Sequence, residues 1–300
     1  MKNNKGFAIT SIIYAMLILF LGLIFLILGN LASRKAMFDK EKNEILSRFN
    51  GDEDGFKIYK NGEVVYFDVT TGTKCSNYTE TQSNTGTKSG CMKFYAFNDD
   101  GKDTVNLILD HNTTAMVGWN SSGSNASGPS EVLTQLNDDT KSWVGTETPS
   151  NYTMDQTGQK NNAKYTIDYS SYKARLITAN EIAQITGNTT WDEKVSASNY
   201  YYFDSKTTTA SDTCKEGNIS GCLYGWLYDR TKTVCTKYGC LNNADSSMSG
   251  VGYWTSSSRA ASSNSVWYVN YLGFVNDVLV NYSGSHGVRP VITILKSKLS

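Results

Sequence analysis

Proline and histidine are scarce in this chain. Only 3 of its 300 residues are proline, which excludes the proline-rich spacers that hold domains apart as extended helices. Only 2 are histidine, His111 and His286, and no G-x-S-x-G, H-E-x-x-H, P-loop or G-x-G-x-x-G motif is present. We therefore expect a protein that is not an enzyme and that binds no cofactor and no metal. A Ser/His/Asp hydrolase built on the two histidines is the enzymatic alternative.

An excess of charge of one sign is also missing. The chain has 28 Lys+Arg and 28 Asp+Glu, so its formal net charge is zero. This removes the simplest case for a nucleic-acid-binding protein, which needs an excess of basic residues. Charged residues make up 19% and hydrophobic residues 39% of the chain, and 19 residues are tyrosine. Most of the polarity is neutral, which argues against a charged disordered chain, and the length allows one or two domains with a buried core.

Long hydrophobic runs are absent except for one near the N-terminus. Residues 7–28 contain no charged side chain. As a helix they would extend about 33 Å, enough to cross a bilayer core of about 30 Å. This run predicts a transmembrane helix in contact with membrane lipid, with a cleaved signal peptide and a buried soluble helix as alternatives. Residues 29–50 predict a helical stalk, because Leu31, Phe38 and Ile45 recur every seven residues among charged side chains.

Two signals disagree about which side of the membrane the polar part faces. Lys and Arg side chains that follow the apolar run favour the cytoplasm. The six cysteines favour an oxidising compartment, because all lie beyond residue 74 in closely spaced pairs and none forms a C-x-x-C metal motif. Loop size predicts three disulfides: Cys75–Cys91, Cys214–Cys222 and Cys235–Cys240. We expect a single-pass protein of the cell membrane whose C-terminal domain is extracellular.

The first residues resemble a type IV prepilin signal. Gly6 and Phe7 stand after a lysine and directly before the apolar run, as in prepilins, whose peptidase cuts after the glycine. The resemblance implies a leader over residues 1–6, processing by a prepilin peptidase and a mature chain that begins at Phe7. The fifth mature position is Ser11, where pilins usually carry the Glu that docks a subunit into the filament. Assembly with other pilin-like subunits, as a minor pilin or pseudopilin, is therefore the alternative hypothesis.

Beyond the stalk the hydrophobic pattern changes to the period of two that strands show. Asn61-Gly62 predicts a hairpin between residues 56–59 and 64–67. Residues 91–97 and 104–109 predict a second hairpin. Together these strands define a hairpin region that packs on, or belongs to, a head domain, and we give it the bounds 51–110.

Two helices can be placed by their first residues. Ser130 opens an apolar-periodic stretch, and Thr178 with Glu181 forms a capping box after the strand-like residues 174–177. Residues 198–286 contain short strands and loops with many aromatic residues.

Three C-terminal motifs resemble formylglycine-generating-enzyme-like domains, a branch of the C-type-lectin-like fold. Residues 175–181 (RLITANE) are similar to their R-L-P-T-x-x-E step, residues 253–257 (YWTSS) to their W-T-S segment and residues 287–291 (GVRPV) to their terminal G-F-R strand. The resemblance implies an α+β C-type-lectin-like domain over residues 111–300, with short antiparallel strands, two or more helices and long loops. The reactive cysteines of those enzymes have no counterpart here, since no cysteine follows Cys240.

Four residues of these motifs are expected to be structural. Arg289 stands among apolar residues and predicts a buried charge, for which Glu181 is the expected carboxylate partner. Arg175 belongs to the same set of scaffold residues. Trp254 is expected in the hydrophobic core.

The segment before the last strand predicts the recognition face. Residues 264–286 are rich in Asn, Tyr and Ser, which suit adaptable contacts. Trp267 and Val269 are expected to face inward and Tyr268 outward. The expected ligand contacts are Tyr201, Tyr268, Tyr271, Asn276 and Tyr282. A polar strand meander and a retroelement-diversified binding segment stay open as alternatives. The leading hypothesis is a membrane-anchored extracellular bacterial surface protein with a recognition or adhesion domain for a protein or glycan.

Overall fold

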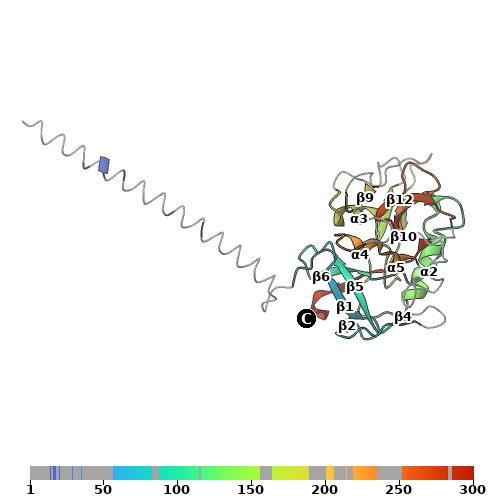
Figure 1. Cartoon of the computed structure of the whole chain (residues 1–300), viewed down its shortest axis with the longest axis horizontal. Helices are drawn as coiled ribbons and strands as arrows, with labels where there is room; N and C mark the ends of the chain where they lie inside the picture. Colours follow the sequence, from blue (N-terminus) through green and yellow to red (C-terminus); the bar gives the residue numbers. More distant parts are fainter. Residues whose placement is uncertain are drawn as a thin grey trace, which may run out of the picture. The chain divides into compact units, whose positions relative to one another are not determined.

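The structure is a computed structural model of the full chain. It describes residues 57–82, 88–114, 116–155, 164–188, 201–205, 214, 219–234, 252–282 and 286–300, with isolated positions among the first 50 residues. The expected leader, most of the expected transmembrane helix and most of the stalk lie outside the described residues. Among the residues that are described, no helix has both the length and the apolar character needed to cross a membrane. The chain divides into two compact units, and we call the second, Ile58–Ser300, the head (Figure 1).

The head contains a first five-stranded sheet in which all neighbours are antiparallel. Its strand order is β14-β6-β5-β1-β2. These strands are β1 (Val64–Asp68), β2 (Thr73–Lys74), β5 (Cys91–Phe97), β6 (Thr104–Leu109) and β14 (Val291–Leu295). The last strand of the head therefore lies in the same sheet as the first. The hairpin region is part of the head rather than a separate layer on it.

A second five-stranded sheet has the order β13-β10-β11-β12-β9. Its strands are β9 (Tyr201–Tyr202), β10 (Gly252–Ser258), β11 (Ser265–Asn270), β12 (Phe274–Leu279) and β13 (His286–Gly287). Only β10 and β13 run parallel to one another. Two small hairpins complete the described strands: β3 (Thr81–Gln82) with β4 (Lys88–Ser89), and β7 (Tyr152–Asp155) with β8 (Lys164–Ile167). With few helices among many strands, the head confirms the expected α+β class.

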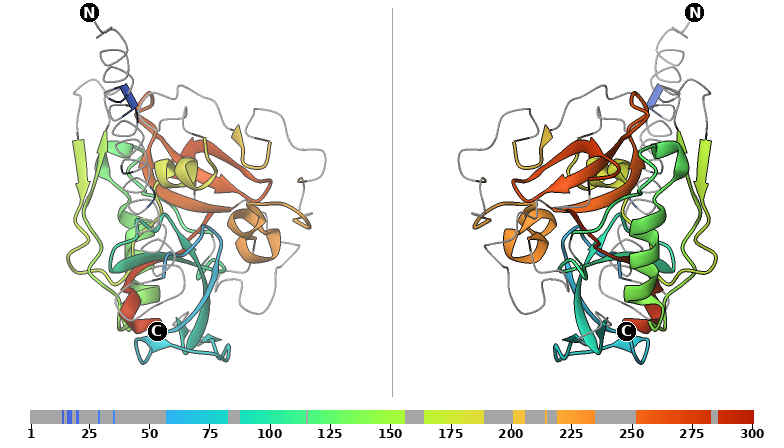
Figure 2. Two further views of the ribbon diagram at one scale, coloured as in Figure 1. Left: turned by 90° about the vertical axis from the view of Figure 1, so that its left-hand side faces the viewer. Right: turned by 90° about the vertical axis from the view of Figure 1, so that its right-hand side faces the viewer.

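The described helices are short. They are α2 (Ser130–Thr140), α3 (Ala179–Ile185), α4 (Gly225–Tyr228), α5 (Arg230–Thr233), and the 3-10 turns η1 (Asn125–Ser127) and η2 (Lys296–Lys298). Both predicted helices are confirmed. The capping box of α3 is complete, since Thr178 Oγ1 accepts from the Glu181 amide at 3.0 Å and Glu181 Oε2 accepts from the Thr178 amide at 2.9 Å. Figure 2 shows the second sheet in orange and red; α3 and α5 contact β10, and α4 contacts β11.

The first predicted hairpin is wrong and the second is confirmed. Residues 57–59 form no strand, and β1 pairs instead with β2 and β5. Asn61-Gly62 still makes a turn, with Gly62 at φ +81°, but the turn leads the chain into β1 from a coil segment. Strand β1 pairs with β5 because Val65 and Phe67 bury one face of it in the core. The second hairpin is formed by β5 and β6, which pair in the antiparallel direction.

Strand β11 is covered on both faces, which overturns the expected orientation of Tyr268. Trp267 and Val269 are buried in one hydrophobic cluster with α3 and α4. Tyr268 and Val266 are buried in another cluster with Trp254. Tyr268 is only 7% exposed, so the alternation along β11 separates two parts of the core rather than core from solvent.

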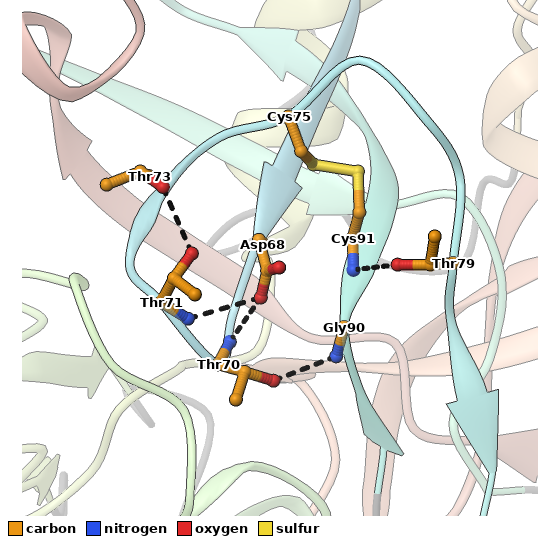
Figure 3. Close-up of a disulfide and its surroundings, with 8 residues drawn as sticks. All are labelled: Asp68, Thr70, Thr71, Thr73, Cys75, Thr79, Gly90 and Cys91. Carbon is orange, nitrogen blue, oxygen red and sulfur yellow. Dashed lines mark hydrogen bonds between the residues drawn. A yellow bond between two sulfur atoms is a disulfide. The ribbon is translucent and has the colours of Figure 1, made fainter.

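Two of the three predicted disulfides are formed. Cys75 bonds to Cys91 and Cys214 bonds to Cys222, and none of the described cysteines is free. Figure 3 shows the first bond, which joins the segment after β2 to the start of β5. Beside it the Cys91 amide donates to Thr79 Oγ1 at 3.0 Å. The expected Cys235–Cys240 bond lies outside the described residues.

Candidate functional site

A polar cleft with a volume of about 380 Å³ lies over the edge of the first sheet, next to the beginning of α3. The backbone of Arg175 exchanges two hydrogen bonds of 2.8 Å with Val291 in β14, so the R-L-I-T segment is fixed alongside that strand. Residues from β6, β7, β14 and the α3 cap meet there. The lining residues are Thr104, Asn106, Ser150, Asn151, Tyr152, Tyr169, Arg175, Leu176, Thr178, Glu181 and Thr293.

A bidentate ion pair lies in the wall of the cleft. Arg175 Nη1 donates to Glu181 Oε2 at 2.8 Å, and Nη2 donates to Oε1 at 2.6 Å. The same two nitrogens also donate to the Leu176 carbonyl and to Asn106 Oδ1. Burial alone would lower the pKa of Arg175, but the Glu181 carboxylate outweighs it and raises that pKa. The predicted pairing of Glu181 with Arg289 is therefore wrong, because the capping box holds this carboxylate beside Arg175.

Arg289 is buried as expected but is held by backbone carbonyl groups. Its Nε donates to the Leu109 carbonyl at 2.7 Å and its Nη1 to the Leu227 carbonyl at 2.8 Å. Its Nη2 donates to the Asp110 and Trp226 carbonyls at 3.0 and 2.8 Å. The side chain thus joins the end of β6 to α4, which is a scaffold role.

Neutral polar groups complete the cleft. Asn106 Oδ1 accepts from Arg175 and, at 2.9 Å, from Thr293 Oγ1, which fixes the orientation of this amide. The Asn106 amide nitrogen and the Thr104 hydroxyl have no hydrogen bond within the described part of the chain. The half-buried Tyr152 has its hydroxyl 3.0 Å from Ser257 Oγ, which also accepts from the Ala179 amide. The site therefore offers hydrogen-bonding groups without a net charge.

The residues predicted to contact a ligand lie elsewhere in the head. Tyr201 pairs through its backbone with β12, and Asn276 lies partly exposed on the same strand. Tyr271 lies 5.5 Å from the Arg230 guanidinium, and Tyr282 is 50% exposed. Tyr268, in contrast, is buried. None of the five lines the cleft, and their role in binding stays a prediction.

Trp254 and His286 are buried in the core of the head. Trp254 is fully buried, as expected, and its indole nitrogen donates to the Val117 carbonyl at 2.6 Å. The His286 ring lies 4.2 Å from both Trp254 and Tyr268. Burial lowers the pKa of His286 to about 3, so this imidazole is neutral near pH 7 and serves as a packing element.

A cluster of ionisable side chains around His111 was missed by the sequence reasoning. His111 Nε2 lies 3.0 Å from Glu80 Oε1, and Asp110 pairs with Lys93 at 3.1 Å and with Lys232 at 3.0 Å. Burial alone would lower the pKa of His111, but the Asp110 and Glu80 carboxylates outweigh it and raise that pKa. Burial would raise the pKa of Asp110, but His111 and the two lysines lower it. These contacts between groups of opposite charge join β5, the end of β6 and α5. The adjacent Asp110-His111 pair at a strand end was the only sequence signal.

Asp204 lies beside the Cys214–Cys222 disulfide. Cysteines in a disulfide offer no thiolate to a metal ion. The Asp204 carboxylate instead accepts from the Leu223 amide at 2.7 Å and from the Tyr228 hydroxyl at 2.8 Å. It therefore fixes the turn that leads into α4.

Comparisons of the chain with protein-family models, with curated proteins and with solved structures each give no significant match.

Proposed function

We propose that this chain is a membrane-anchored, extracellular bacterial surface protein whose head is a C-type-lectin-like domain for recognition or adhesion. The anchor is the apolar run of residues 7–28, which has the length and the lack of charge that a membrane span needs. The head follows the stalk and faces outward. Its partner is a ligand at the cell exterior.

The disulfides carry the proposal. The head forms Cys75–Cys91 and Cys214–Cys222, each between cysteines that are close in sequence. Such bonds persist in oxidising compartments and are rare in the cytosol of mesophiles. They therefore outweigh the basic residues that follow the apolar run, which favour the opposite topology.

The arrangement of the head supports the fold named in the proposal. Strands β1 and β14 lie in one sheet, and the resemblance implies such a meeting of the chain ends. Trp254 of the W-T-S motif and Arg289 of the terminal motif are both buried. The Arg175–Glu181 ion pair joins the two ends of the R-L-I-T-x-x-E motif. Residues of all three motifs thus have structural roles in the head.

A minor pilin or pseudopilin is the second candidate, and the Gly6-Phe7 junction before the apolar run favours it. Both candidates share the anchor and the outward head. They differ in cleavage after Gly6 and in incorporation into a filament. Mass spectrometry of the native N-terminus separates them, since a chain that begins at Phe7 supports the pilin route and an intact Met1 contradicts it.

Protease treatment of intact cells that express the full chain tests the topology. We expect added protease to remove the head from intact cells, and a membrane-impermeant maleimide to label the described cysteines only after reduction. A head that is digested only after cell lysis, with thiols that react without reduction, would refute the outward topology.

A further inference from the structure

We propose that the cleft beside Arg175 and Glu181 is the recognition site of the head, and that it binds an uncharged, polyhydroxylated ligand with the chemistry of a neutral sugar residue. The inference rests on the proposed recognition function and names the ligand class. It also moves the site away from the tyrosine-rich segment that the sequence favours.

The charges of the cleft are already used within the protein. Both terminal nitrogens of Arg175 are occupied by the two oxygens of Glu181 and by further acceptors. An anionic ligand would have to displace Glu181, and a cationic ligand would have to displace Arg175. A bidentate pair of this kind adds polarity to the wall without favouring a charge of either sign.

The groups that remain open at the cleft are neutral and come from separate parts of the chain. Within the described residues, the Thr104 hydroxyl and the Asn106 amide nitrogen have no partner, and both belong to β6. Thr178 Oγ1 accepts from the Glu181 amide, which leaves its hydroxyl proton for an acceptor in the cleft. Hydroxyl and amide groups both donate and accept, so this set matches a ligand that carries several hydroxyl groups.

The size and the apolar part of the cleft fit the same ligand. Its volume of about 380 Å³ lies near the lower end of the range of about 300 to 1,000 Å³ that small-molecule sites occupy. The half-buried Tyr152 adds an aromatic wall. Such a wall can cover the C–H surface of a sugar ring while the polar groups bind its hydroxyls. The cleft is partly open, so the sugar can be one residue of a longer glycan.

Saturation-transfer difference NMR on the full chain in detergent micelles tests the inference. The probes are glucose, galactose, mannose and N-acetylglucosamine, with glucuronate as the anionic comparison. The variant Thr104→Val removes one open hydroxyl at constant shape, and Asn106→Ala removes the open amide. The matched control is Thr166→Val, an exposed threonine on β8 whose hydroxyl bonds only to Thr153 among the described residues. Tyr271→Ala reports on the face that the sequence favours.

We expect at least one neutral sugar to bind with a millimolar Kd, and we expect glucuronate to bind no more tightly. Thr104→Val and Asn106→Ala should each weaken binding about tenfold, while Thr166→Val and Tyr271→Ala leave it unchanged. Thr104→Val should also keep the melting temperature, which separates lost contact from lost fold. Binding that survives both cleft variants but is lost in Tyr271→Ala would overturn the site and keep the recognition function. Tighter binding of glucuronate, or no transfer to any neutral sugar, would overturn the ligand class, whereas the protease test of topology is unaffected by either result.

Discussion

Replacing Arg289 by methionine tests how a charge is held in the core of the head. Met has a similar length and no donors, so Arg289→Met deletes four hydrogen bonds to the carbonyl groups of Leu109, Asp110, Trp226 and Leu227. These carbonyls belong to the end of β6 and to α4, which are far apart in sequence. The substitution therefore removes the link between two parts of the fold together with the charge.

The expected cost follows from two opposing contributions. A hydrogen bond to a charged group contributes about 1.5–3 kcal/mol, so four of them contribute roughly 6–12 kcal/mol. Burial of the guanidinium costs several kcal/mol, and methionine does not bear that cost. The difference is a loss of about 4 kcal/mol in the free energy of unfolding. For a domain of this size we expect a melting temperature lower by about 8–16 °C.

Urea denaturation of the full chain in detergent, followed by tryptophan fluorescence, measures this change. Trp254 and Trp267 are buried in the head and report on its unfolding. The matched control is Arg230→Met, since Arg230 is exposed and packs beside Tyr271. We expect the control to change the free energy of unfolding by less than about 1 kcal/mol. If Arg289→Met lowers the free energy of unfolding by no more than this control does, the four hydrogen bonds to carbonyl groups do not stabilise the fold and our reasoning is wrong.

Three further changes should alter stability in the same assay. Replacing Cys75 and Cys91 together by serine opens a loop with a sequence separation of 16 and should cost about 3 kcal/mol, whereas an unchanged urea midpoint would mean that the bond is dispensable. Because burial lowers the pKa of His286 to about 3, the unfolded chain binds a proton near pH 6.5 and the folded head does not. The free energy of unfolding should then fall by up to about 1.4 kcal/mol for each unit by which the pH is lowered from about 6.5 to about 3. His286→Phe should flatten this dependence, and an identical pH profile in the variant would contradict the assignment. Thr178→Ala removes the cap of α3 and should cost about 1 kcal/mol, which Thr178→Ser should restore.

Local features of the fold could be predicted from the sequence because their causes lie within a few residues. The capping box at Thr178 needs only Glu181 three positions later, and it is complete in the structure. The β5–β6 hairpin needs two strands and a short turn, and it has the expected pairing. The Cys75–Cys91 bond closes a short loop, and loop size was a sufficient guide.

Features that depend on distant partners could not be predicted in this way. The partner of β1 is decided by which strand covers Val65 and Phe67, and the turn at Asn61-Gly62 carries no information about that. The apolar neighbours of Arg289 predicted a buried charge. Its four acceptors, however, are backbone carbonyl groups from two separate segments, and the residue types in the sequence do not indicate which carbonyl groups these are. The side chains around Tyr268 alternate as they do in a strand with one face in solvent, yet Tyr268 is buried in a hydrophobic cluster on its own side of the strand.

The candidate site also combines a local feature that the sequence indicates with groups that only distant strand pairing brings together. The spacing of Arg175 and Glu181 placed both residues at one step from strand to helix, although the sequence analysis paired Glu181 with Arg289 and gave Arg175 no partner. The open groups of Thr104 and Asn106 lie about 70 residues earlier and reach the cleft only because β6 pairs with β14. A single sequence contains no local sign of that pairing, so the cleft could be found only in the folded chain.

The Cys75–Cys91 bond would have a mechanical consequence in the membrane-anchored protein that we propose. A pulling force applied at the N-terminal end of the head loads β1 first, and antiparallel pairing with β2 and β5 lets that strand be peeled away one bond at a time. Peeling stops at Cys75, because the covalent bond passes the load directly to Cys91 at the start of β5. At most about 60 Å of chain can be released before that point. The bond therefore keeps the loop between Cys75 and Cys91 out of the loaded path, so that this loop cannot be extended under tension until the disulfide is reduced.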